Sequence, residues 1–174
     1  MNREDKLLMA ALSGSTEAFE QLGEGYLLGG FGAPDYEKAL YWNRRAAQNN
    51  SARGAACLGL MYLEGKGVPR NLEEACRYLQ LATDNGDMKA PRHLGNLYKE
   101  GIDGIPDVEK AATCYKIAAE RGDITGQYEL ARCYETGMGV KQDLEQAIVW
   151  YKKSAERGDR IARPAMDALR RLGV

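Results

Sequence analysis

One glycine-rich segment has residues that could bind a phosphate group. Residues 62–75 read YLEGKGVPRNLEEA, in which Lys66 stands between two glycines just ahead of a predicted helix. A nucleotide-binding loop needs the pattern G-x-x-x-x-G-K-[ST], a preceding strand and a hydroxyl group for the metal. No serine or threonine follows Lys66, and the segment MYLEG upstream does not have the pattern of a strand. We therefore interpret these residues as a corner between two helices.

Other reactive side chains form no catalytic or metal-binding motif. The chain has one histidine, His93, and neither a G-x-S-x-G nor an H-E-x-x-H motif. The acidic loop between Asp103 and Asp107 has fewer oxygen ligands than a calcium loop needs, and Asp107 is explained as a helix cap. We expect no catalytic residue, no metal, no cofactor and no enzymatic activity.

The four cysteines lack the C-x-x-C spacing of a zinc site. They form two pairs whose members are 19 residues apart, Cys57 with Cys76 and Cys114 with Cys133. Antiparallel helices could bring each pair level. Buried thiols in a reducing compartment are the preferred interpretation, and a disulfide remains open if the Cβ atoms face each other.

Composition limits the classes of partner. The chain has 174 residues, 28% of them charged, and a net charge of −1, so it is long enough for one domain with a core and too weakly charged for nucleic-acid binding. The N-terminal apolar run is too short for a secretory signal, and no apolar run approaches the ~18 residues of a membrane span. We expect a cytoplasmic protein without membrane insertion.

A period of 36 residues organises the chain. It relates, among others, Tyr26, Tyr62, Tyr98 and Tyr134. We divide the single predicted domain, residues 1–174, into an N-terminal half-repeat helix (1–14), four repeats (15–50, 51–86, 87–122 and 123–158) and a C-terminal capping helix (159–174).

Each repeat has the pattern of a helical hairpin. The first helix carries Leu-Gly-x-x-Tyr, which places apolar groups on one face. The second helix begins at a residue whose side chain can cap it, namely Asp35, Asn71, Asp107 and Asp143. Glycines that end second helices precede acidic residues expected to cap the next first helix, in the pairs Gly86–Asp87, Gly122–Asp123 and Gly158–Asp159. Aromatic residues of the second helices, Tyr41, Trp42, Tyr115, Trp150 and Tyr151, are expected in the core. Pro164 should make the last helix start late or bend.

These units resemble the Sel-one-like repeats (SLR), which are relatives of the tetratricopeptide repeats (TPR). The fourth repeat matches the SLR pattern at Leu130, Ala131, Tyr134, Gly137, Gly139, Val140, Asp143, Ala147, Trp150, Tyr151, Ala155 and Gly158. The first and third depart from it at the corner, where they read GGFGAPD and GIDGIPD. The resemblance implies an all-α fold, a right-handed α-solenoid (α/α superhelix) of four helix-turn-helix repeats with capping helices. It also implies an adaptor or scaffold that holds other proteins, often in bacterial signalling or host contact.

By analogy with TPR proteins, the first helices line a concave face that binds a protein or peptide. Positions of these helices that miss the apolar face vary between repeats, and seven of them are candidate binding residues: Arg53, Leu60, Lys89, Arg92, Asn96, Tyr128 and Arg132. The basic residues resemble the clamp with which some TPR proteins hold a peptide carboxylate, which favours an acidic or C-terminal segment. The alternatives are a solvated face without a partner, an inhibitor or immunity-type protein that binds a folded partner, and a hydrolase.

Overall fold

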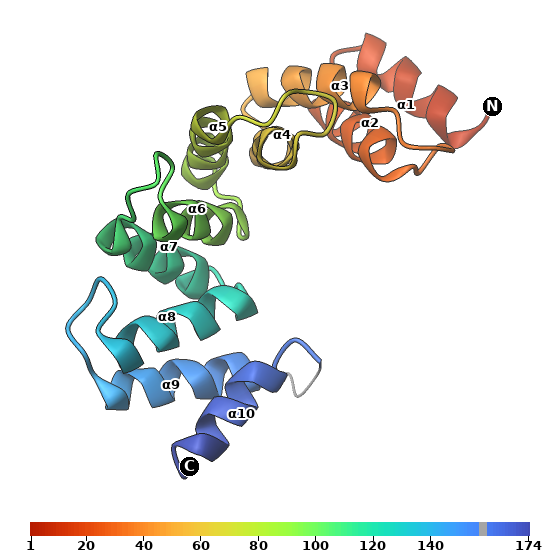
Figure 1. Ribbon diagram of the computed structural model, residues 1–174. Helices are drawn as coiled ribbons and strands as arrows, with labels where there is room; N and C mark the ends of the chain where they lie inside the picture. The colour runs from red at the N-terminus through yellow and green to blue at the C-terminus, as the bar shows by residue number, and fades with distance from the viewer. Residues whose placement is uncertain (157–159) are drawn as a thin grey trace. The chain divides into compact units, whose positions relative to one another are not determined.

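The computed structural model describes residues 1–156 and 160–174, and these residues form helices and no strands (Figure 1). The helices are α1 (Arg3–Leu12), α2 (Thr16–Leu28), α3 (Tyr36–Gln48), α4 (Ala52–Glu64), α5 (Leu72–Asp84), α6 (Ala90–Glu100), α7 (Val108–Glu120), α8 (Ile124–Thr136), α9 (Leu144–Ala155) and α10 (Arg163–Arg171). The predicted all-α class, with four hairpins and a helix at either end, is confirmed. The predicted helix end at Gly158 and the predicted cap at Asp159 lie outside the described residues.

The chain divides into two compact units, Met1–Asp87 and Met88–Val174. In the N-terminal unit, α1 packs on α2, and the hairpins α2–α3 and α4–α5 pack on each other through α3 and α4. In the C-terminal unit, the hairpins α6–α7 and α8–α9 pack through α7 and α8, and α10 packs on α9. That the whole chain is one domain stays a prediction.

The second helices begin at the predicted caps. The side chains of Asp35, Asn71, Asp107 and Asp143 each accept a hydrogen bond of 3.0 Å from a backbone N–H of the first helical turn. The backbone N–H of each cap donates in turn to the carbonyl of the tyrosine nine residues earlier, as from Asn71 to Tyr62 at 3.0 Å. These two bonds close the corner in every repeat, because they pair backbone groups that a helix end leaves unsatisfied.

The prediction that Asp87 is the N-cap residue of its helix is wrong. Asp123 caps α8 as expected, by accepting from the Gly126 N–H, but α6 starts only at Ala90, and its N-cap residue, Lys89, makes no side-chain cap hydrogen bond. The reason is Pro91, which has no N–H to donate to the carbonyl four residues earlier. A helix starting at Asp87 would lose that bond, so α6 starts later, with Pro91 in its first turn.

The glycine-rich segment is a corner, as predicted. Gly65 and Gly67 have φ angles of +70° and +73°, values that L side chains rarely adopt. A Cβ on Gly67 would lie 2.6 Å from the Cβ of Tyr36 in the preceding repeat. The ammonium group of Lys66 lies 2.6 Å from the carboxylate of Glu64. The two glycines therefore allow the positive φ angles of the corner, and Gly67 allows the corner to pack closely on the neighbouring hairpin.

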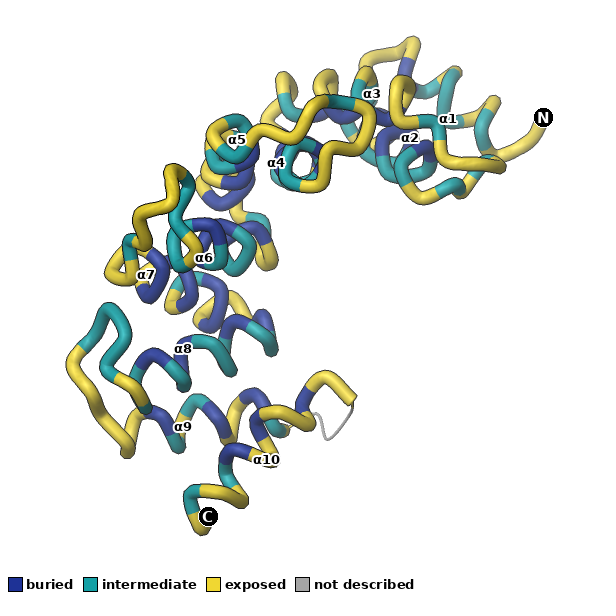
Figure 2. Tube along the Cα trace, in the orientation of Figure 1, coloured by how far each residue is buried: buried dark blue, intermediate teal, exposed yellow. Residues whose placement is uncertain are grey.

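The core lies between the helices of each hairpin and between adjacent helices of consecutive hairpins. Along each helix, buried residues alternate with exposed ones (Figure 2). Tyr115 and Tyr151 are fully buried, and Trp42 and Trp150 are half-buried against core clusters. The prediction is wrong for Tyr41, which is 51% exposed. Its phenol instead accepts a hydrogen bond of 2.9 Å from Arg45, because this helix position faces outward.

The cysteines are thiols; Cys114 and Cys133 are buried, and Cys57 and Cys76 are half-buried. The preferred interpretation is thus confirmed for the free thiols, and the expected burial is confirmed for Cys114 and Cys133. Burial raises the pKa of Cys57 and of Cys133 to about 11, since a thiolate is poorly stabilised away from water.

The C-terminal helix starts late, as Pro164 predicted. It begins at Arg163, which places Pro164 in the first turn. Ala165 and Ala168 are buried on its apolar face, whereas Ile161, expected on the same face, precedes the helix and is 55% exposed.

Small residues of the first helices allow the two helices of a hairpin to approach. A Cβ on Gly59 would lie 2.6 Å from Cγ of Leu79, and one on Gly95 would lie 2.7 Å from the ring of Tyr115. The first hairpin has the same arrangement with a polar partner, since Gly23 faces Asn43. Asn43 is fully buried, and neither atom of its carboxamide has a hydrogen-bond partner among the described residues.

Replacing Gly59 with valine should lower the free energy of unfolding by about 1–3 kcal/mol, because the added methyl groups overpack the contact with Leu79. Urea denaturation followed by circular dichroism measures the change. Lys152→Val, at an exposed position of α9, shows the effect of a valine on a helix where it meets no buried neighbour. Helix propensity favours valine over glycine, so it cannot explain a loss of stability at Gly59. Equal stability of the two variants would contradict the helix approach described here.

Replacing Asn43 with leucine should raise the free energy of unfolding by about 1–3 kcal/mol, because it removes an unsatisfied buried polar group. The equivalent residue of the next repeat, Leu79, already packs on a glycine in this way. The reciprocal change, Leu79→Asn, should destabilise the protein. A lower melting temperature for Asn43→Leu than for the wild type would count against this explanation.

Candidate protein-binding surface

We call the exposed and half-buried side chains of α2, α4, α6 and α8, together with Lys89 at the N-cap of α6, the first-helix surface, and describe it separately in each unit. In the N-terminal unit, polar side chains of this surface form contacts between consecutive repeats. The guanidinium group of Arg53 on α4 pairs with the carboxylate of Glu24 on α2, and this hydrogen bond raises the pKa of Arg53. Beside it, the Ser51 hydroxyl donates to Glu20 at 2.5 Å. Arg53 stays 53% exposed and Leu60 is half-buried, so both are within reach of a partner.

In the C-terminal unit, two candidate residues are held by contacts within the protein. Arg92 Nε donates to Asp123 Oδ1 at 3.0 Å, and the two side chains are only 18% and 7% exposed. Asn96 accepts a hydrogen bond of 2.7 Å from the Tyr115 hydroxyl. The sequence analysis gave Arg92 a binding role alone. This ion pair adds a structural role, because Asp123 also caps α8.

The other candidates of this unit are more accessible. Lys89 is exposed at the start of α6. Arg132 is 43% exposed and lies 3.4 Å from Glu129, and its guanidinium group is 5.9 Å from the ring centroid of Tyr128. Glu129 is also 3.4 Å from Lys99. Tyr128 and Arg132 therefore present an aromatic ring and a cation together on α8.

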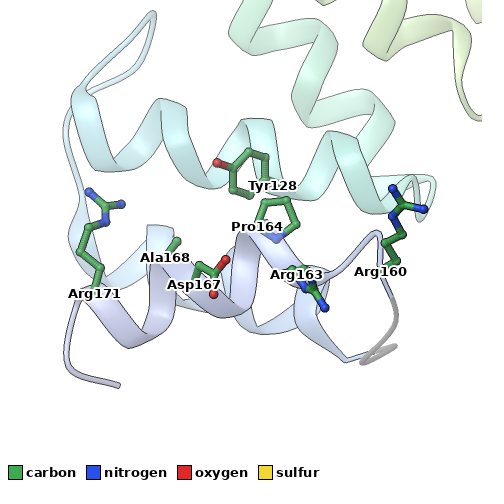
Figure 3. A pocket seen from close by; sticks show the side chains of 7 residues that line it. All are labelled: Tyr128, Arg160, Arg163, Pro164, Asp167, Ala168 and Arg171. Atoms are coloured by element: carbon green, nitrogen blue, oxygen red, sulfur yellow. The ribbon is translucent and has the colours of Figure 1, made fainter.

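The structure adds a pocket that the sequence analysis missed. It has a volume of about 570 Å³ and lies between Tyr128 of α8 and residues of α10 and the segment before it (Figure 3). Its charged lining residues are Arg160, Arg163, Asp167 and Arg171. Of the lining residues, the sequence analysis gave a binding role to Tyr128 and to none of the arginines. The available signal was their density, since arginine occurs at positions 157, 160, 163, 170 and 171.

One end of this pocket is held by a network that runs from the exposed Arg171 to the buried Tyr151. Arg171 lies 2.8 Å from Glu135 of α8. Glu135 also accepts a hydrogen bond of 2.6 Å from the Tyr151 hydroxyl, and burial followed by this bond raises the pKa of Tyr151. The ring of Tyr151 is in turn 5.7 Å from that of Tyr128. The last helix is thus tied to α8 and α9 by charge as well as by apolar packing.

A smaller hollow of about 290 Å³ lies in the N-terminal unit, between α3 and α5. Its two arginines are both engaged. Arg77 pairs with Glu74 at 2.7 Å, and Arg44 donates to the Tyr62 hydroxyl at 3.2 Å. This hollow therefore offers a ligand less unpaired charge than the pocket beside α10.

No group of three or more histidine, cysteine or acidic residues is placed to hold a metal ion in residues 1–156 and 160–174. The single histidine, His93, is half-buried, and its Nε2 lies 3.3 Å from Arg92. None of the described helices is both long and apolar enough to cross a membrane.

Comparison with known proteins supports the repeat pattern. The family model for the Sel1 repeat matches residues 20–51, 54–87, 92–123 and 124–159. No curated protein sequence matches the chain.

Solved structures include similar chains. A Sel1 repeat protein from Oxalobacter formigenes is 32% identical, with a TM-score of 0.86 over 98% of this chain and 68% of its own. The protective antigen c5321 of uropathogenic Escherichia coli, which displays an SLR fold, is 31% identical with a TM-score of 0.88. That match covers all of this chain but 37% of the antigen. Cysteine-rich protein B of Helicobacter pylori is 25% identical, with a TM-score of 0.59 over 75% of this chain and 94% of its own.

Replacing Arg92 with glutamate should lower the free energy of unfolding by about 2–4 kcal/mol, because the loss of one partner leaves the other charge of a buried ion pair uncompensated. The residual solvent access of Arg92 keeps this loss below that of a fully buried pair. Thermal and urea denaturation measure the effect. The matched control is Lys89→Glu, an exposed charge reversal one turn earlier, which should change stability by less than about 0.5 kcal/mol. Equal stability of both variants would show that the Arg92–Asp123 pair contributes nothing.

Proposed function

The chain belongs to the Sel1 repeat family, and we propose that it is a non-enzymatic scaffold that binds a protein partner through its first-helix surface. Sel1 repeat proteins are generally protein–protein interaction scaffolds, and their fold is typically non-catalytic. The binding surface and the class of partner are the parts proposed here.

The observation that carries the proposal is the contrast between buried and exposed positions of the first helices. The buried leucine recurs in each repeat as Leu22, Leu58, Leu94 and Leu130. Accessible positions on the same helices and at their N-caps differ between repeats, and include Arg53, Lys89, Tyr128 and Arg132. A surface that varies on a repeated frame is suited to one particular partner.

The accessible residues favour a partner segment with carboxylates. A guanidinium group can hold a carboxylate through two parallel hydrogen bonds, and Arg132 lies beside an aromatic ring that can pack on an apolar side chain. Arg92 and Asn96 position this surface through Asp123 and Tyr115. The partner we propose is an acidic or C-terminal peptide segment of another protein, and neither nucleic acid nor membrane.

The thiol state of the cysteines supports a reducing compartment such as the cytoplasm as the place of action. Burial holds the pKa of Cys57 and of Cys133 at about 11, which leaves little reactive thiolate near neutral pH. These thiols are compatible with a cytoplasmic protein.

Charge reversal of the exposed candidates should weaken partner binding. In affinity capture from the native cell, followed by calorimetric titration of the partner identified, the variant Arg53→Glu/Lys89→Glu/Arg132→Glu should raise the Kd at least about tenfold, a loss of about 1.4 kcal/mol. The reason is that three attractive contacts with carboxylates become repulsive.

The matched control reverses three exposed lysines outside the first-helix surface, Lys6→Glu/Lys116→Glu/Lys152→Glu. It changes the net charge equally and should leave the Kd within about twofold. Both variants are compared by circular dichroism before titration. The same affinity for the wild type and the first-helix variant would remove this surface from the proposal.

A further inference from the structure

The pocket beside α10 carries an excess of positive charge. Three guanidinium groups and one carboxylate line it, from Arg160, Arg163, Arg171 and Asp167. The chain as a whole has a net charge of −1, so this excess is local. A concave site that concentrates one sign of charge attracts groups of the opposite sign.

The existing ion pairs leave part of this charge available. Arg171 is held by Glu135 at 2.8 Å, and Asp167 is 3.2 Å from Arg170, which lies outside the lining. Within the described residues, no carboxylate lies within ion-pair distance of Arg160 or Arg163. Figure 3 shows these two arginines toward one end of the pocket, Arg171 at the other and Asp167 between them.

Apolar groups separate the charged ends. The ring of Tyr128 and the side chains of Pro164 and Ala168 line the pocket between the arginines. A volume of about 570 Å³ falls in the range of pockets that hold drug-sized ligands, about 300–1,000 Å³. A single small anion would leave most of this volume and all of the apolar lining unused, whereas a few residues of a peptide would contact both.

We propose that this pocket binds an acidic segment of a partner protein. One carboxylate binds between Arg160 and Arg163, the intervening residues pack on Tyr128 and Pro164, and a second carboxylate approaches Arg171. Asp167 repels a carboxylate at the middle of the pocket and accepts a hydrogen bond from a backbone N–H there. That the occupant belongs to a protein rests on the proposed scaffold function.

The proposal is tested with the full chain and a synthetic probe. The probe is a fluorescein-labelled octapeptide of alternating glutamate and glycine with an amidated C-terminus, and its binding is followed by fluorescence anisotropy. We expect Arg163→Glu to raise the Kd at least about tenfold, because an anchoring guanidinium becomes a repelling carboxylate. The matched control is Lys152→Glu, a charge reversal of the same size at an exposed position of α9 outside the pocket lining, and it should change the Kd less than about twofold.

A second variant changes affinity in the opposite direction. Asp167→Asn removes the carboxylate that faces the peptide and should lower the Kd by about two- to fivefold. A variant that merely damaged the fold would not tighten binding. If Arg163→Glu does not fold, as judged by circular dichroism, Arg160→Glu replaces it with the same expectation.

Several results would overturn the proposal. They are equal weakening by Arg163→Glu and Lys152→Glu, equal binding of the same octapeptide with glutamine in place of glutamate, and absence of binding at millimolar peptide. Displacement of the peptide by inorganic phosphate at lower concentration than the peptide itself would assign the pocket to a free anion. A dimer in sedimentation experiments on the protein alone that Arg163→Glu dissociates would assign it to a second copy of this chain.

The experiment separates this pocket from the first-helix surface. If Arg53→Glu/Lys89→Glu/Arg132→Glu leaves partner binding intact while Arg163→Glu abolishes peptide binding, the pocket stands and the first-helix surface fails. If the first-helix variant loses the partner and Arg163→Glu leaves peptide binding unchanged, the pocket fails and the first-helix surface stands.

Discussion

The first helix of each hairpin carries a residue with little or no side chain where a large buried residue of the second helix crosses it. Gly59 meets Leu79 and Gly95 meets Tyr115 at distances that leave no room for a Cβ. In the fourth repeat, Ala131 shares a buried cluster with Tyr151. Because interiors pack at near-crystalline density, this approach fixes how the two helices lie, and with it which side chains of the first helix stay at the surface.

The corners preserve this arrangement although their sequences differ. In every repeat the cap side chain accepts from the first turn of the second helix, and the cap N–H donates to a tyrosine carbonyl of the first helix. The first and third repeats depart from the common corner sequence, yet Asp35 and Asp107 make the same bonds as Asn71. Because the backbone groups at the end of the first helix and the start of the second are hydrogen-bonded in every repeat, the corner residues between the two helices can vary in sequence.

Charged side chains of the first helices take part in two kinds of contact. Some join consecutive repeats, as in the pairs of Arg53 with Glu24 and Arg92 with Asp123. Arg53 is half-exposed and can still meet a partner, whereas Arg92 is largely enclosed. The pocket beside α10 differs, because two of its arginines, Arg160 and Arg163, form no ion pair with a carboxylate of the described residues. Charged residues that are enclosed in ion pairs within the protein therefore have a structural role, whereas those without such a pair are candidates for contact with a partner.

The sequence by itself determined the repeat, the hairpins, the caps at Asp35 and Asn71 and the burial of Tyr115, because local hydrogen bonds and helical periodicity depend on residues close in the chain. Only the tertiary structure decided that Arg92 pairs with Asp123 and that Arg163 lines a pocket with Tyr128. Both contacts join residues about 30 or more positions apart. They depend on how neighbouring helices rotate and on where each long side chain turns, which periodicity does not specify.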